Sequence, residues 1–84
     1  MKLLLIEDDR EIAGALCQVL ASAYDVSLVG TGMSGLEKAR AEIPDVILLD
    51  VMMPGLDGWR VAEELLEDDR TESIPIVFLT ARAE

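Results

Sequence analysis

Apolar residues along the chain fall into two kinds of pattern. Two short uninterrupted runs, Leu3–Ile6 and Val46–Leu49, are typical of buried strands, and a third run, Ile76–Leu79, predicts a further strand. Partial alternation predicts another strand over Tyr24–Val29. Between these runs, apolar residues recur at helical spacing. The order β-α-β-α-β-α-β predicts one α/β domain over residues 1–84, with a parallel sheet covered on both faces.

Small polar residues mark where the predicted helices begin. Thr31 or Ser34 is expected to cap the second helix, which should run through Ile43. Asp57 is expected to cap the third helix, because it directly precedes a stretch with apolar residues at helical spacing. The polar segment 67–73, which connects this helix to the last strand, is predicted to be exposed.

Polar side chains follow three of the predicted strands at the point where each strand ends. Glu7, Asp8 and Asp9 come after the first strand, Asp50 ends the third and Thr80 follows the fourth. In open parallel sheets, ligands bind beyond the carboxyl ends of the strands. The sequence therefore predicts that these groups gather at one edge of the sheet.

Several carboxylates held close together repel one another, so they raise one pKa or require a cation. Mg²⁺ is the expected ion because it prefers oxygen ligands and retains some of its waters. Asp8 and Asp50 are the predicted direct ligands, with Glu7 acting through water and a backbone carbonyl supplied by the loop after Asp50. A carboxylate beside Mg²⁺ can attack phosphorus, and Thr80 could then donate its hydroxyl to a phosphoryl oxygen.

Each of these residues also has a purely structural interpretation. Asp8 and Glu11 have the spacing of a capping box, so Asp8 could do no more than cap the first helix. Asp57 is expected to be only a cap, and Thr80 alone would be an ordinary residue at a strand end. Their joint placement at three strand ends favours the functional interpretation.

The amino-acid composition argues against several classes of binding partner and of catalytic or metal site. Seventeen acidic residues against seven basic ones give a formal net charge of -10, which argues against direct binding to nucleic acid or to an anionic membrane surface. The single cysteine, Cys17, permits no internal disulfide and fits a reducing cytoplasm; it is expected to be a small core residue. The absence of histidine excludes a catalytic triad and the usual zinc sites. The early apolar run, Leu3–Ile6, is too short for a signal peptide or a membrane span.

Three segments, LLLIEDD, VILLDVMMPGLDGW and IPIVFLTAR, resemble the receiver domain of two-component response regulators. The combination of an acidic pair, an aspartate followed by MPGLDG and a Thr-Ala pair at a strand end is specific, and the match covers the whole chain. The segments MMPGLDGW and LTAR are most similar to those of regulators that carry a winged-helix DNA-binding domain. The resemblance implies a flavodoxin-like sheet with strand order 2-1-3-4.

The resemblance also implies a role for each matching residue. Asp50 would be the phosphoacceptor, receiving a phosphoryl group from a cognate sensor histidine kinase and so controlling a downstream output such as transcription. Glu7 and Asp8 would form the acidic metal pair, and Met52 would offer its backbone carbonyl to Mg²⁺. Thr80 would be the switch hydroxyl. Such a domain is no enzyme beyond its own phosphorylation and dephosphorylation.

The chain departs from the family's pattern at its end. Receivers normally continue with a helix, a lysine-bearing fifth strand and a last helix, whereas this sequence stops at Glu84, so it is expected to be truncated after the fourth strand. Lys2 and Lys38 are in the wrong places to replace that lysine. A non-phosphorylated remnant that serves only protein assembly is therefore an alternative. A phosphatase of the haloacid dehalogenase type ranks last, because Met52 stands where that family has a second aspartate.

The same departure predicts association. Without a fifth strand, the run Ile76–Leu79 would be an apolar sheet edge with open backbone donors and acceptors, which invites pairing with another chain. The chain is therefore expected to form a homodimer, through this edge or by exchanging elements. Since the net charge opposes association, salt should strengthen it.

Overall fold

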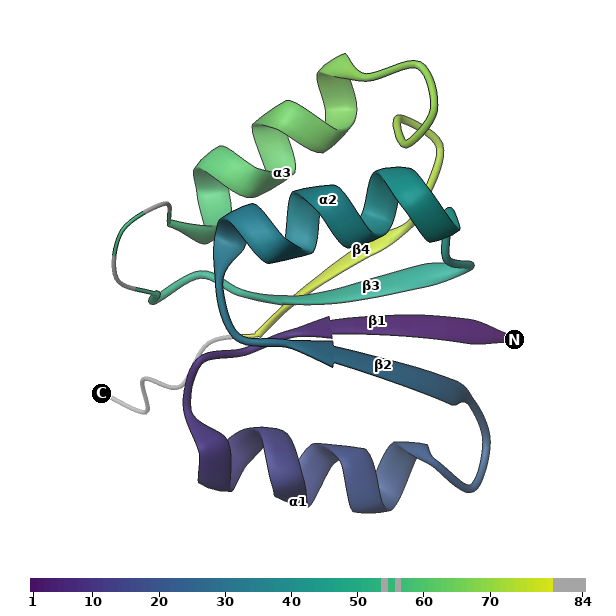
Figure 1. Cartoon of the computed structure of the whole chain (residues 1–84), viewed down its shortest axis with the longest axis vertical. Helices are drawn as coiled ribbons and strands as arrows, with labels where there is room; N and C mark the ends of the chain where they lie inside the picture. The colour runs from purple at the N-terminus through teal and green to yellow at the C-terminus, as the bar shows by residue number, and fades with distance from the viewer. Residues whose placement is uncertain (54, 56, 80–84) are drawn as a thin grey trace.

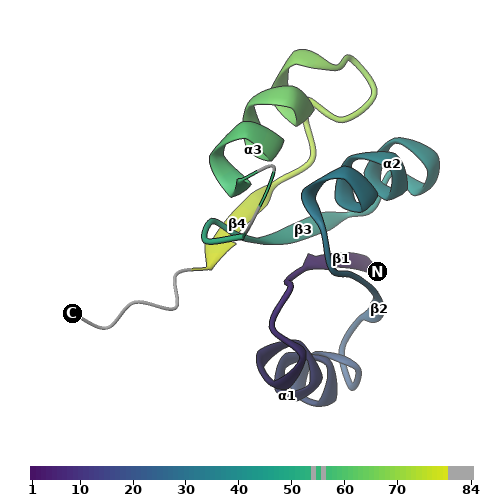
Figure 2. The ribbon, with the colours of Figure 1, turned by 60° about the vertical axis from the view of Figure 1, so that its left-hand side comes forward.

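The computed structural model describes residues 1–53, 55 and 57–79, and in them a parallel sheet lies between two layers of helix. Figure 1 shows α2 and α3 on one face of the sheet and α1 on the other, and Figure 2 shows the same layers from the side. The elements in chain order are β1 (Lys2–Ile6), α1 (Arg10–Leu20), β2 (Asp25–Val29), α2 (Gly32–Glu42), β3 (Val46–Asp50), α3 (Gly58–Glu67) and β4 (Ile76–Leu79).

The sheet confirms the predicted fold class and strand order. All three strand pairs are parallel, and the spatial order is β2-β1-β3-β4. The register places Ile6 of β1 beside Val29 of β2 and Leu49 of β3. It also places Asp50 beside Leu79 of β4. The ends of these strands therefore meet at one edge of the sheet, as the pattern of apolar runs predicted.

The larger part of the core lies between the sheet and the helices α2 and α3. Leu4, Ile6, Ile47 and Leu49 point to this face and are almost fully buried, at 0% to 1% exposure. Their helical partners in the same cluster are Leu36, Ala39, Val61, Ala62 and Leu65. Burying such aliphatic side chains is the main favourable term in folding. It also fixes the strand ends from which the acidic residues project.

The two ends of α2 can be compared with the predicted cap and the predicted last residue of that helix. Thr31, not Ser34, caps α2: its hydroxyl oxygen accepts a hydrogen bond from the Ser34 backbone N–H at 3.0 Å. The helix ends at Glu42, one residue before the predicted end, because Ile43 adopts a left-handed conformation (φ 47°). The following Pro44 cannot continue a helix ladder.

The predicted core position of Cys17 is wrong. In α1 only Ala13 is fully buried, and Cys17 is half-buried. Ile12 and Val19, which belong to the same apolar stripe, are 36% and 71% exposed. The stripe at helical spacing is real, but α1 packs against its face of the sheet without a neighbouring helix among the described residues (Figure 2). A helix without lateral partners leaves part of its apolar face in water.

The polar segment 67–73 is exposed as predicted, except at the half-buried Asp68 and the buried Thr71. Thr71 is 1% exposed, and its hydroxyl donates to the backbone carbonyl of Leu65 at 2.7 Å, where it joins the longer bond from the Asp68 N–H in the last turn of α3. Asp68 accepts from the Arg40 side chain of α2 at 3.1 Å. The side-chain and backbone hydrogen bonds from Arg70, followed by the charges of Arg70 and Arg40, hold the pKa of Asp68 well below its usual range. The segment therefore anchors the end of α3 to α2.

Candidate functional site

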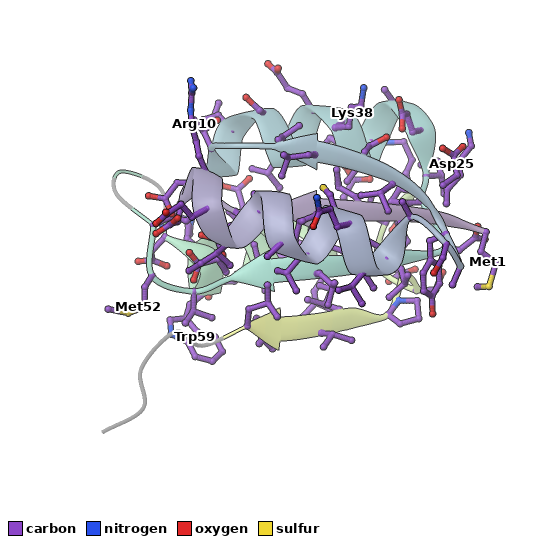
Figure 3. The ribbon with its side chains drawn as sticks, turned by 90° about the horizontal axis from the view of Figure 1, so that it is seen from below. Met1, Arg10, Asp25, Lys38, Met52 and Trp59 are labelled. Carbon is purple, nitrogen blue, oxygen red and sulfur yellow. The ribbon has the colours of Figure 1, made fainter. Side chains whose placement is uncertain are left out.

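Three carboxylates meet at the carboxyl edge of the sheet. Glu7 and Asp8 follow β1, and Asp50 is the last residue of β3. One oxygen from each of the three lies within 4.8 Å of the others. Figure 3 shows Arg10 and Met52 at this end of the sheet, opposite Met1 and Asp25. The structure thus brings together the three acidic side chains that were predicted to form the metal site.

Burial and mutual repulsion set the electrostatics of this cluster. Glu7 is 5% exposed and Asp50 is 4% exposed, while Asp8 faces solvent. The pKa of Glu7 is raised to about 7, chiefly by burial. The Asp9 backbone N–H lowers it, while the hydrogen bond and charge of Asp50 and the charge of Asp8 add to the rise. Three negative charges are therefore not stable together at this edge, and either a proton or a cation offsets them.

The Asp50 carboxylate is held by its own loop. The Met52 backbone N–H donates to Asp50 Oδ1 at 3.0 Å, and the Val51 N–H donates to the Leu79 carbonyl oxygen at 3.4 Å. On the other side, the Gly58 N–H at the start of α3 donates to the Val51 carbonyl oxygen at 3.4 Å. Strand β4 and helix α3 therefore fix the backbone that carries Asp50.

Asp8 and Asp9 have different tasks, and the interpretation of Asp8 as a helix cap is wrong. Asp9 is the N-cap of α1, with its Oδ1 accepting from the backbone N–H groups of Glu11 (2.9 Å) and Ile12 (3.2 Å). The Asp9 N–H in turn donates to Glu7 Oε2 at 3.0 Å. Because Asp9 meets the capping requirement, the side chain of Asp8 is left free to join the acidic cluster.

The other candidate residues are placed as follows. Asp57 caps α3, as predicted, with its Oδ1 accepting from the Arg60 N–H at 2.9 Å. Met52 lies beside Asp50 and its side chain is 54% exposed; the role of its carbonyl as a metal ligand stays a prediction. Thr80 lies outside the described residues.

The donor set fits Mg²⁺. It consists only of carboxylate oxygens, on one exposed and two buried side chains, so an ion bound there could retain several waters. A cation would also favour the ionised form of Glu7, which burial disfavours. Sequence reasoning missed one contributor to this edge, Gly58, whose α-carbon packs against the Asp50–Val51 backbone; a glycine in a loop reads first as a turn residue.

Comparison with known proteins agrees with this geometry. Residues 3–84 match the family model of the response regulator receiver domain. The chain is 43% identical over 81 residues to the transcriptional regulatory protein AfsQ1 of Streptomyces coelicolor, covering 95% of this chain and 35% of that one. It is 42% identical over 80 residues to the response regulator PleD of Caulobacter vibrioides, covering 93% of this chain and 18% of that one. The chain thus spans only a minor part of these curated relatives.

The fold is also similar to solved structures of receiver domains. The receiver domain of the sensor histidine kinase PA1611 of Pseudomonas aeruginosa superimposes with a TM-score of 0.92 at 32% identity. The match covers 98% of this chain and 68% of that one, and that structure has a magnesium ion coordinated in its active site cleft. In the part of this chain that the structure describes, no helix is long and apolar enough to cross a bilayer.

Proposed function

Because the chain belongs to the response regulator receiver domain family, we propose that Asp50 accepts a phosphoryl group from a sensor histidine kinase. The phosphorylated state would control a downstream output, and transcription is the output that similarity to AfsQ1 favours. The observation that carries the proposal is the cluster of Glu7, Asp8 and Asp50 at one sheet edge. The kinase, the output and any further domain are proposals for the whole protein, because the chain spans 5% to 36% of its curated relatives.

The geometry supports a simple division of labour in the transfer. An Asp50 carboxylate oxygen would attack phosphorus in line as the bond from phosphorus to the donor breaks, leaving an acyl phosphate on Asp50. Met52 holds Asp50 Oδ1 through its N–H, which orients the carboxylate. Glu7, Asp8 and Asp50, with the proposed Met52 carbonyl, would hold Mg²⁺, which when bound neutralises charge on the phosphoryl oxygens. Thr80 is proposed as the hydroxyl that contacts the phosphoryl group.

The metal part of this proposal is tested by titrating Mg²⁺ while following Trp59, the only tryptophan. Trp59 follows Gly58, which contacts the Asp50–Val51 backbone, so binding at the cluster should shift or quench its emission. Asp8→Asn should weaken binding because it removes a ligand charge. Asp9→Asn is the matched control: it removes the same charge one residue on but keeps a capping side chain. No fluorescence or calorimetric response at millimolar Mg²⁺ would remove the site.

A second candidate function is protein assembly without phosphorylation, and the sheet edge favours it. Among the described residues, β4 pairs with β3 on one side and with no strand on the other. Val77 and Phe78 of this edge strand are 49% and 41% exposed. An exposed apolar edge strand is a template for pairing with another chain, so we also propose that these residues mediate a homodimer, by edge pairing or by exchange of elements.

A further inference from the structure

Gly58 begins α3, and its α-carbon lies against the backbone of the proposed phosphoacceptor. The residue is buried. A Cβ atom built on it would lie 2.5 Å from Val51 Cα and 3.0 Å from the Asp50 carbonyl carbon, and it would contact the Asp50 carbonyl oxygen even more closely. All three are backbone atoms, so no side-chain rotation can make room. Only glycine lets helix and strand approach this closely.

Gly35 provides the contrast. It also lies in the first turn of a helix, α2, and is also buried. A Cβ there would lie 2.5 Å from Ile6 Cδ1, 3.0 Å from Ile6 Cγ1 and 3.3 Å from Ile6 Cγ2, all atoms of a buried side chain and none of the backbone. The same added methyl group would therefore crowd the core at Gly35 but would push on the Asp50 backbone at Gly58.

The steric clash created by a Cβ atom at position 58 would be relieved by moving α3 away from the Asp50–Val51 backbone. Val51 is tied to Leu79 of β4 on one side and to the Gly58 N–H on the other. A methyl group on residue 58 would separate the start of α3 from the Asp50–Val51 peptide, lengthening the already long 3.4 Å bond from Gly58 N–H to Val51 O. The Asp50 carboxylate would then move relative to the Met52 N–H and to the two carboxylates on β1.

We infer that Gly58 is a positioning residue of this site: its missing side chain lets α3 fix the Asp50 carboxylate opposite Glu7 and Asp8. This inference rests on the proposed function of Asp50. Glycine is required at position 58 because of its contact with the strand backbone, and Gly58 is neither a proposed metal ligand nor the proposed phosphoacceptor. Supporting contacts of this kind around a metal site change affinity by about 10- to 100-fold when they are lost.

The test compares Gly58→Ala with Gly35→Ala in the whole chain. Mg²⁺ affinity is measured by calorimetry, unfolding by denaturant titration, and the backbone amides by nitrogen–proton NMR. We expect both variants to unfold at lower denaturant than the parent. Only Gly58→Ala should weaken Mg²⁺ binding, by about tenfold or more. In the absence of metal, only Gly58→Ala should shift the Met52 amide, because that amide donates to Asp50 Oδ1.

Equal Mg²⁺ affinity and an unmoved Met52 amide in Gly58→Ala would overturn the inference, as would an equal loss in both variants. If the parent chain binds no Mg²⁺, the proposed metal site fails, and the metal-free Met52 amide alone decides the inference. If Gly58→Ala does not fold, the inference is tested instead by NMR on the parent chain titrated with Mg²⁺. Added Mg²⁺ should then shift the Gly58 amide together with that of Met52 and leave Gly35 in place, and a Gly58 amide that does not respond would overturn it.

Discussion

Glu7 lies in an environment unlike that of an ordinary surface acid. Its pKa is raised to about 7 from 4.5, chiefly by burial and then by Asp50. Between these two pH values the folded chain keeps a proton that the unfolded chain releases. The free energy of unfolding should therefore fall as the pH rises from about 4.5 to about 7 and should change little with this group outside that window.

Denaturant unfolding of the metal-free chain across this pH range measures that prediction. Glu7→Gln should flatten the dependence, because glutamine has no proton to lose, and the variant should be more stable than the parent at pH 7. Saturating Mg²⁺ should also reduce the slope in the parent, since the ion favours ionised Glu7. A parent whose stability rises with pH throughout this window, or a Glu7→Gln variant with an unchanged slope, would contradict the prediction.

At the scale of elements, two neighbouring aspartates have different roles: Asp9 caps α1, and Asp8 belongs to the proposed metal site. Asp9→Ala should lower the free energy of unfolding by about 1 kcal/mol, because the N–H groups of Glu11 and Ile12 lose their acceptor. It should leave Mg²⁺ affinity nearly intact. Asp8→Ala should do the reverse, losing affinity while keeping stability or gaining some through relief of repulsion with Glu7. Chemical denaturation and Mg²⁺ calorimetry on both variants check this, and the idea fails if Asp8→Ala is the less stable one.

The elements also show how far sequence reasoning reaches. Strands β1 and β3 were predictable because short apolar runs are typical of strands buried on both faces. The apolar run of β4 also predicted a strand, although Val77 and Phe78 are exposed. The convergence of Glu7 and Asp50 followed from the parallel order. The capping role of Asp9 was not predictable, since Asp8, with Glu11 three residues on, has the spacing of a capping box and Asp9 does not. The burial of Thr71 and the half-exposure of Cys17 depend on which elements pack beside them, and that is a property of tertiary structure that local pattern does not contain.

At the scale of the whole molecule, the open β4 edge and the net charge of -10 act in opposite directions. We expect the 84-residue chain to dimerise and the dimer to strengthen as salt screens the repulsion. Light scattering after size exclusion, at low and high salt, measures this. Val77→Lys, which puts a charge on the exposed edge strand, should yield monomer. A parent that is monomeric and unfolds cooperatively at both salt concentrations would show that four strands suffice alone.

Phosphorylation of the isolated chain also depends on the whole molecule, because groups from several strand ends must offset the charge on the phosphoryl group. The 84 residues contain two lysines. Lys2 opens β1 at the opposite end of the sheet, and Lys38 of α2 pairs with Glu42 at 3.0 Å. Without a lysine beside Asp50 to offset the developing charge, labelling by a small phosphodonor should be slow and of low yield.

The most direct test of the account is therefore to incubate the chain with acetyl phosphate, with and without Mg²⁺, and to locate the label by mass spectrometry. The account predicts a small, Mg²⁺-dependent aspartyl phosphate on Asp50, lost in Asp50→Asn and retained in Asp57→Asn, which removes the same charge from a capping residue outside the acidic cluster. A label that survives Asp50→Asn, a label that forms equally well without Mg²⁺, or no label at all would contradict the claim that Asp50 is a metal-assisted phosphoacceptor.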